Sequence, residues 1–251
     1  MLYGNIAAFS LFMSHSFNDN EYMKQLLLAT LLASFIFASH SVSGAGLSDL
    51  SNQETSVGLK AALEKGAGAA VGQLGKENGF LSNEKVKIRL PSTLEKIRPV
   101  LQMTGKSGQL DELVIAMNRA AEAAVPKAKP LLMNAVKSMT ISDAKNILTG
   151  GDTSVTEFFR QKTSSQLGKE FLPVVKSVTD KSGLSSKYNN VMAQVQKFGV
   201  VDSQESTVEG YVTERALDAL FVMIGEEEKA IRKDPLGAGS KAISKVFSLL
   251  N

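Results

Sequence analysis

The residues with the best spacing for chemistry interrupt an apolar stretch in the middle of the chain. Residues 109–139 predict two helices joined at Pro126, and the first is apolar or small on nearly every face. Asn118, Arg119 and Glu122 are the exceptions, and at separations of three and four residues Arg119 and Asn118 each share a helix face with Glu122. Because buried polar groups need hydrogen-bond partners, we expect other parts of the chain to supply them.

Three more charged residues are candidates for a site with this central helix. Arg160 follows two phenylalanines, while Asp218 and Glu226 belong to a long helix predicted over residues 208–233. One interpretation is a polar pocket between the central and long helices that binds an anionic or zwitterionic ligand through Arg119 and Arg160. The other is a structural network that neutralises buried charges, and we favour it.

Carboxylates also raise two further possibilities. Glu122, Asp218 or Glu226 with the two arginines would suit a hydrolase or lyase. The run Glu226–Glu228 could hold a hard cation, but it lacks the loop geometry of a calcium site. A solvated helix face with Glu228 paired to Arg232 is the favoured interpretation. The sequence therefore predicts no metal site and no cofactor.

Composition excludes several mechanisms. The chain has no cysteine, and its two histidines, His15 and His40, precede the cleavage site predicted below. A mature chain without imidazole or thiol cannot form Ser-His-Asp, Cys-His or zinc sites. The 28 Lys+Arg against 25 Asp+Glu are mixed along the chain, and no basic cluster with interleaved aromatics predicts nucleic-acid binding.

The N-terminal region has the pattern of a secretory signal. A charged start at Met23-Lys24 precedes the 13-residue apolar run Leu26–Ala38 and small residues through Ala45. The run is shorter than the ~20 residues that span a membrane. We expect residues 23–45 to be a signal peptide cleaved near Ala45, which predicts a periplasmic protein. Residues 1–22 are interpreted as an upstream extension, with the true start at Met1 or Met23 left open.

Residues 46–251 predict a single all-α domain, a bundle of about eight to ten helices, several of them short or kinked at proline. Thr140 with Asp143 predicts a capping box, Thr153 a helix cap, and Thr163 with Gln166 the start of another helix. Gly183 is the predicted residue after a helix C-terminus.

One segment does not fit a helix. Val86, Ile88 and Leu90 alternate with charged residues, a period of two that is typical of extended structure. No second strand pattern is available to pair with it. We therefore expect an extended segment that lies across the bundle.

Several segments together resemble one known family, the bacterial domain of unknown function family 4197. They cover essentially the whole predicted mature chain, and they are GLKAALEKGAGAAVGQLG (58–75), VKIRLPSTLEKI (86–97), MNRAAEAAVPKAKPL (117–131), MTISDAKNILTG (139–150), FFRQKT (158–163) and YVTERALDALFVMIGEEEKAIRKDP (211–235). The resemblance implies an exported, all-helical protein of about this length. It implies no catalytic residues, because the family has no established activity.

The favoured functional hypothesis is a non-enzymatic binding protein of the bacterial envelope. Its partner would be a small hydrophobic or anionic ligand, or an envelope protein, because an alanine- and glycine-rich helical core can leave a cavity. Membrane contact would be at most peripheral, through an amphipathic turn at Lys241–Leu250. The hydrolase or lyase is the alternative.

Overall fold

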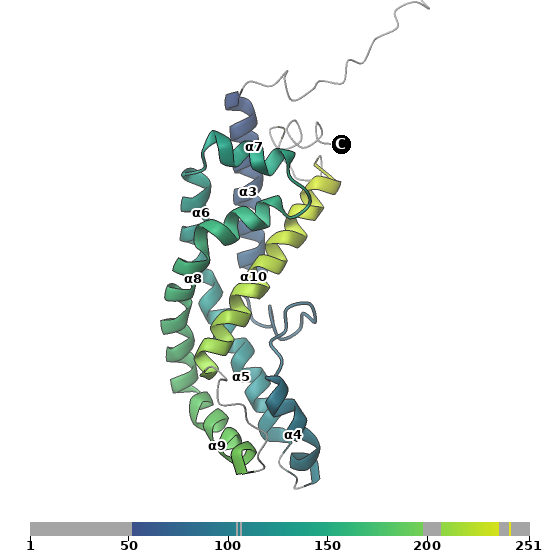
Figure 1. Ribbon diagram of the computed structural model, residues 1–251, viewed down its shortest axis with the longest axis vertical. Helices are drawn as coiled ribbons and strands as arrows, with labels where there is room; N and C mark the ends of the chain where they lie inside the picture. The colour runs from purple at the N-terminus through teal and green to yellow at the C-terminus, as the bar shows by residue number, and fades with distance from the viewer. Residues whose placement is uncertain (1–51, 104, 106, 198–206, 236–240, 242–251) are drawn as a thin grey trace, which may run out of the picture. The chain divides into compact units, whose positions relative to one another are not determined.

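A computed structural model describes residues 52–103, 105, 107–197, 207–235 and 241 (Figure 1). These residues form eight α-helices and one 3₁₀ turn and contain no strand, which confirms the predicted all-α fold. All of them lie within one compact unit, Gly46–Asn251. The predicted leader and nearly all of the predicted C-terminal turn fall outside the described residues.

The helices follow one another in the order labelled in Figure 1. They are α3 (Asn52–Leu74), α4 (Ser92–Met103), α5 (Gly108–Ala124), the 3₁₀ turn η2 (Val125–Lys127), α6 (Ala128–Lys137), α7 (Ile141–Thr149), α8 (Ser154–Lys181), α9 (Leu184–Lys197) and α10 (Val208–Lys233). The most extensive contact joins α8 and α10. Helix α5 packs against α8, and α3 packs against α10.

The central helix α5 lies in the core, as its composition predicts. Leu110, Leu113, Met117, Ala121 and Ala124 are completely buried. Their spacing of three, four, four and three residues places them on one continuous stripe of the helix. The stripe explains why a helix that carries three polar residues in its second half can still pack against α8, α9 and α10.

Three predicted helix boundaries are confirmed. The backbone N–H of Asp143 donates to Oγ1 of Thr140 at 3.1 Å, and the backbone N–H of Thr140 donates to Oδ2 of Asp143 at 3.0 Å. This reciprocal pair is the predicted capping box. The hydrogen bond from the Thr140 backbone holds the pKa of Asp143 below its ordinary value. Pro126 lies in the 3₁₀ turn between α5 and α6, and Gly183 follows α8 with a φ of 66°.

The helix start predicted at Thr163 is wrong. Helix α8 continues from Ser154 to Lys181, through both Thr163 and Pro173. The hydroxyl of Thr163 donates to the Phe159 carbonyl within the helix at 2.6 Å, so it caps nothing. Buried side chains recur every four residues at 159, 163, 167, 171 and 175, and this continuous stripe keeps the helix intact across the proline.

Residues 76–91, which follow Gly75 after α3 and end where α4 begins, are the crossing segment. Val86, Ile88 and Leu90 are buried, whereas Lys85 and Arg89 are exposed and Lys87 is half-buried, so the predicted alternation is confirmed. The segment pairs with no strand among the described residues. Its backbone groups must therefore find other partners.

The tight packing of Gly79, near the start of the crossing segment, predicts the effect of a substitution on stability. A Cβ added at Gly79 would lie 2.4 Å from the Gln73 carbonyl oxygen and 2.6 Å from that of Leu74, whereas a Cβ at Gly72 in α3 would meet open space. We predict that Gly79→Ala lowers the free energy of unfolding by about 1–3 kcal/mol, because backbone must shift. Gly72→Ala should raise it by up to about 1 kcal/mol, since alanine favours a helix.

Urea unfolding followed by circular dichroism measures both variants. Gly72→Ala is the matched control, because it makes the same chemical change inside a helix. Equal effects of the two substitutions would contradict the steric argument.

Candidate binding site

The side chain of Asn118 holds the crossing segment on α5. Asn118 is fully buried. Its Oδ1 accepts a hydrogen bond from the N–H of Ile88 at 2.9 Å, and its Nδ2 donates to the Ile88 carbonyl at 2.8 Å. The Nδ2 also donates to the Val114 carbonyl at 2.7 Å. The amide thus pairs with both backbone groups of Ile88, as a neighbouring strand would, and replaces the missing strand.

Glu122 holds the beginning of the same segment. Its Oε1 accepts hydrogen bonds from the N–H groups of Phe80 and Leu81 at 3.1 and 3.3 Å. Its Oε2 accepts from Nη1 of Arg119 at 2.6 Å, and Nη2 of Arg119 donates to Oδ1 of Asn78 at 2.8 Å. Glu122 is only 5% exposed, and the guanidinium of Arg119 balances its charge. The expected pairing of Arg119 with Glu122 is confirmed.

The other three predicted site residues lie elsewhere. Arg160 on α8 forms an ion pair with Asp218 on α10 at 3.8 Å, and its guanidinium lies 4.6 Å from the centre of the Phe221 ring. Glu226 accepts a hydrogen bond from Lys85 of the crossing segment, which holds the pKa of Glu226 below its ordinary value. The described contacts therefore group the α5 residues with one another and Arg160 with Asp218, but do not gather all six around one pocket.

The crossing segment also contacts α10. The hydroxyl of Tyr211 donates to the Arg89 carbonyl at 2.9 Å, and Nδ2 of Asn83 lies 3.7 Å from the sulfur of Met223. The segment therefore bridges α5 and α10, the two helices between which the sequence predicts a polar pocket. Asn118 and Glu122 find partners in the backbone of this segment, whereas Arg119 pairs with Glu122 and with the side chain of Asn78.

An open pocket of about 310 Å³ lies beside the crossing segment. Its lining combines the apolar side chains of Leu81, Val114 and Ile115 with the charged side chains of Lys87, Arg89, Glu95, Arg98 and Asp111. The volume is at the lower end of the range of small-molecule sites, roughly 300–1,000 Å³. None of the six predicted site residues lines it, although Asn118 and Glu122 bind the backbone of two residues that do.

One guanidinium organises the acidic side of this pocket. Arg98 on α4 donates from Nε to Glu95 at 2.8 Å and from Nη1 to Asp111 on α5 at 2.9 Å. Hydrogen bonds to Glu95 and then to Asp111 raise the pKa of Arg98 above its ordinary value. Sequence reasoning missed this site because its charged residues come from three different elements. The signals of it in the sequence are local: the alternation of Lys87 and Arg89, and the spacing of three residues between Glu95 and Arg98 on one helix.

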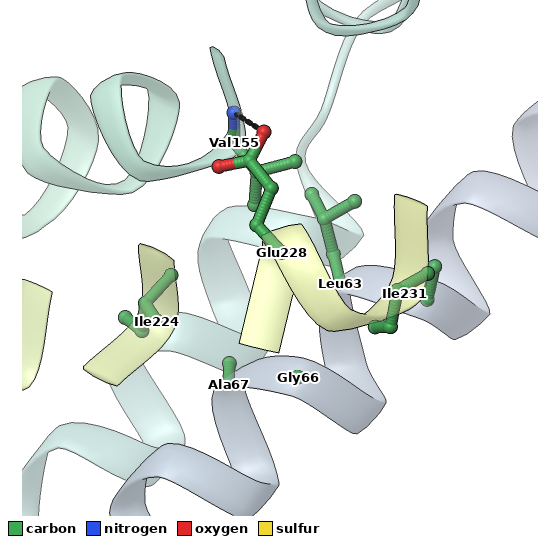
Figure 2. Close-up of a pocket in the computed structure, with 8 residues that line it drawn as sticks. Leu63, Gly66, Ala67, Val155, Ile224, Glu228 and Ile231 are labelled. Atoms are coloured by element: carbon green, nitrogen blue, oxygen red, sulfur yellow. Dashed lines mark hydrogen bonds between the residues drawn. The ribbon is translucent and has the colours of Figure 1, made fainter. Parts of the chain in front are cut away.

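A second, smaller cavity lies between α3, α8 and α10 (Figure 2). Leu63 and Ala67 of α3 line it with Ile224 and Ile231 of α10, and Glu228 is its one charged residue. Its volume is about 10 Å³, which holds at most one water molecule. This cavity is a packing gap beside a buried carboxylate and has no room for a ligand.

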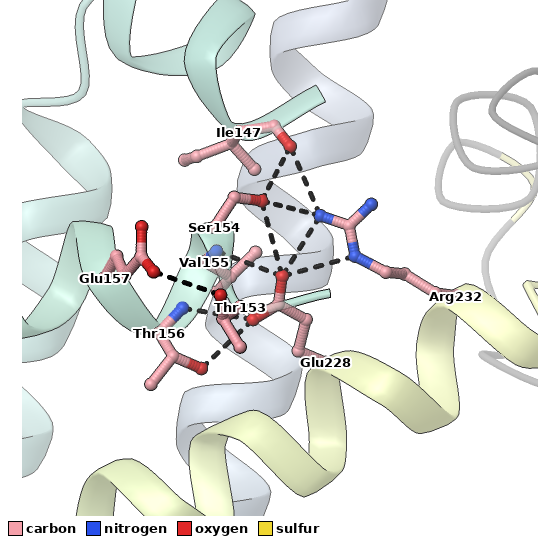
Figure 3. Close-up of polar contacts among 8 residues, drawn as sticks. All are labelled: Ile147, Thr153, Ser154, Val155, Thr156, Glu157, Glu228 and Arg232. Carbon is pink, nitrogen blue, oxygen red and sulfur yellow. Dashed lines mark hydrogen bonds and ion pairs between the residues drawn. The ribbon is translucent and has the colours of Figure 1, made fainter. Parts of the chain in front are cut away.

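Glu228 caps helix α8 from α10 (Figure 3). Its Oε1 accepts from the N–H of Val155 at 3.0 Å and its Oε2 from the N–H of Thr156 at 3.1 Å. These N–H groups belong to the first turn of α8 and have no partner inside the helix. Thr153, the predicted cap, makes no such bond, and its hydroxyl donates to Glu157 instead.

Arg232 completes this buried network. Its Nη2 donates to Oε1 of Glu228 at 3.0 Å and to the Ile147 carbonyl near the end of α7 at 3.2 Å. The predicted pair is therefore confirmed, but the predicted solvated face is wrong for Glu228, which is only 4% exposed. Glu228 follows the buried Ile224 by four residues, so it lies on the apolar stripe of α10.

These features define an all-helical protein. Of the two pockets described above, one is open and large enough for a small ligand. Within the described ranges, no helix is long and apolar enough to cross a membrane. No group of three or more acidic, histidine or cysteine side chains in the same ranges could hold a metal ion.

The chain belongs to the family described as protein of unknown function (DUF4197), whose model matches residues 49–248. The family resemblance drawn from the sequence is thereby confirmed. No curated protein and no solved structure gives a significant match to the chain.

The buried network predicts which glutamate of α10 matters for stability. Glu228→Ala should lower the free energy of unfolding by about 3–5 kcal/mol, because it removes the carboxylate that balances the charge of Arg232 and that accepts from two helix N–H groups. Glu227→Ala, the matched control, removes a solvent-exposed hydrogen bond from Gln73 and should cost about 1 kcal/mol or less. Chemical denaturation compares them. A cost for Glu228→Ala no larger than that of the control would show that Glu228 is not a cap.

Proposed function

We propose that this protein is a non-enzymatic, ligand-binding protein of the periplasm whose site is the open pocket beside the crossing segment. The observation that carries the proposal is an accessible volume of about 310 Å³ lined by both apolar and charged side chains. Small-molecule sites commonly combine apolar contact area with a few placed polar groups that fix the ligand's orientation. Recognition of this kind needs no imidazole, thiol or metal.

The hydrolase or lyase alternative has less support. Each of its three candidate carboxylates, Glu122, Asp218 and Glu226, lies in an ion pair with a basic side chain. A carboxylate that is held by a basic side chain must leave that partner before it can exchange a proton with a substrate. Glu122 is also buried and accepts two backbone N–H bonds.

The location in the envelope follows from the apolar run Leu26–Ala38 and the small residues through Ala45. This leader lies outside the described residues. The proposal also allows an envelope protein as the partner. It includes at most peripheral membrane contact, and it does not include nucleic-acid binding. Fractionation of cells with mass spectrometry of the mature N-terminus tests the export step, and a precursor that stays uncleaved in the cytoplasm would contradict it.

Filling the pocket tests the binding function. Ile115 lines the pocket and is 47% exposed, so a tryptophan there should occupy the pocket without disturbing the core. We predict that native mass spectrometry of the protein purified from cells shows a bound small molecule, and that Ile115→Trp lowers its occupancy at least about tenfold because the volume is taken.

The matched control is Ile141→Trp, the same change at a 64% exposed position on α7, away from the pocket lining. This variant should retain the bound mass. A wild-type protein without any bound small molecule, or equal retention by both variants, would contradict a binding function for this pocket.

A further inference from the structure

The charged side chains around the open pocket divide into two groups of opposite net charge. Lys87 and Arg89 lie two residues apart on the crossing segment, so they project from the same side of an extended chain. Glu84, which does not line the pocket, lies 3.5 Å from Lys87 and 2.8 Å from Arg89. Two cations that share one carboxylate leave a net positive charge on this side.

The opposite arrangement occurs where α4 meets α5. Here one guanidinium, that of Arg98, is shared by the carboxylates of Glu95 and Asp111. Two anions with one cation leave a net negative charge. The side chain of Asp111 is 65% exposed, so part of its carboxylate is open to solvent and to a ligand.

Apolar contact completes the description of the pocket. Leu81, Val114 and Ile115 line the same volume as the two charged groups. A ligand that complements all three must carry a negative group, a positive group and an apolar portion. The volume of about 310 Å³ and only three apolar side chains favour a small molecule over a lipid with a long acyl chain.

We infer that the pocket binds a small zwitterion with apolar side chains, namely a short apolar peptide with free termini. This inference rests on the proposed binding function and adds the chemical class of the ligand. The terminal carboxylate faces Lys87 and Arg89, and the terminal ammonium faces Asp111 and Glu95. The apolar side chains contact Val114 and Ile115.

Three related probes test the inference by isothermal titration calorimetry with the purified protein. Leucyl-leucine carries both terminal charges, N-acetyl-leucyl-leucine lacks the ammonium, and leucyl-leucine amide lacks the carboxylate. We expect leucyl-leucine to bind and each blocked peptide to bind about tenfold more weakly, since each loses one charge-assisted contact. The affinity should fall with added salt, because the pocket is open to solvent.

Two substitutions assign the charges to their sides. Lys87→Gln should weaken leucyl-leucine about tenfold and abolish its advantage over the amide, whereas Asp111→Asn should abolish its advantage over the acetylated peptide. Lys145→Gln, at an exposed lysine on α7, is the charge-matched control and should leave all three affinities unchanged. Thermal unfolding checks that each variant is folded.

The outcomes separate this inference from the proposed function. Equal binding of all three peptides, or no binding of any of them at millimolar concentration, overturns the zwitterion inference. A small molecule that still co-purifies with the wild type and is lost from Ile115→Trp then leaves the binding function standing. If no peptide binds and no ligand co-purifies, the zwitterion inference and the proposed binding function are both refuted.

Discussion

The structure depends on backbone groups that regular secondary structure leaves unpaired and that buried polar side chains satisfy. An N–H or carbonyl in the interior without a partner costs about 1–3 kcal/mol, so each one must be matched. Asn118 pairs with both backbone groups of Ile88, Glu122 accepts from the start of the crossing segment, and Glu228 caps the start of α8. The polar residues that look most like a site in the sequence thus mainly bind the protein itself.

Much of the fold is predictable because its signals are local. The capping box of Thr140 and Asp143, the break at Pro126 and the alternation around Ile88 each depend on residues a few positions apart. The helix start predicted at Thr163 is wrong because the Thr163 hydroxyl bonds within its own helix. A long stripe of buried side chains keeps α8 continuous past this residue. Tertiary packing overrides a local signal there.

The site was harder to predict because its geometry is not local. The need of Asn118 and Glu122 for partners is visible in the sequence, but the identity of those partners is not, since backbone amides carry no sequence signature. Glu228 offers one signal, its position on the apolar stripe of α10, which contradicts a solvated face. The pocket with Arg98 between two carboxylates forms only when α4, α5 and the crossing segment meet.

The proposed binding function uses the residues that the scaffold leaves open. It requires that the buried polar side chains are already occupied by the chain's own backbone. Amide hydrogen exchange of the Ile88 N–H, measured by nuclear magnetic resonance, tests that claim most directly, because its acceptor is the Asn118 side chain. The account predicts exchange slowed by several orders of magnitude, as for amides in a stable core. Exchange as fast as in an unstructured peptide would contradict it.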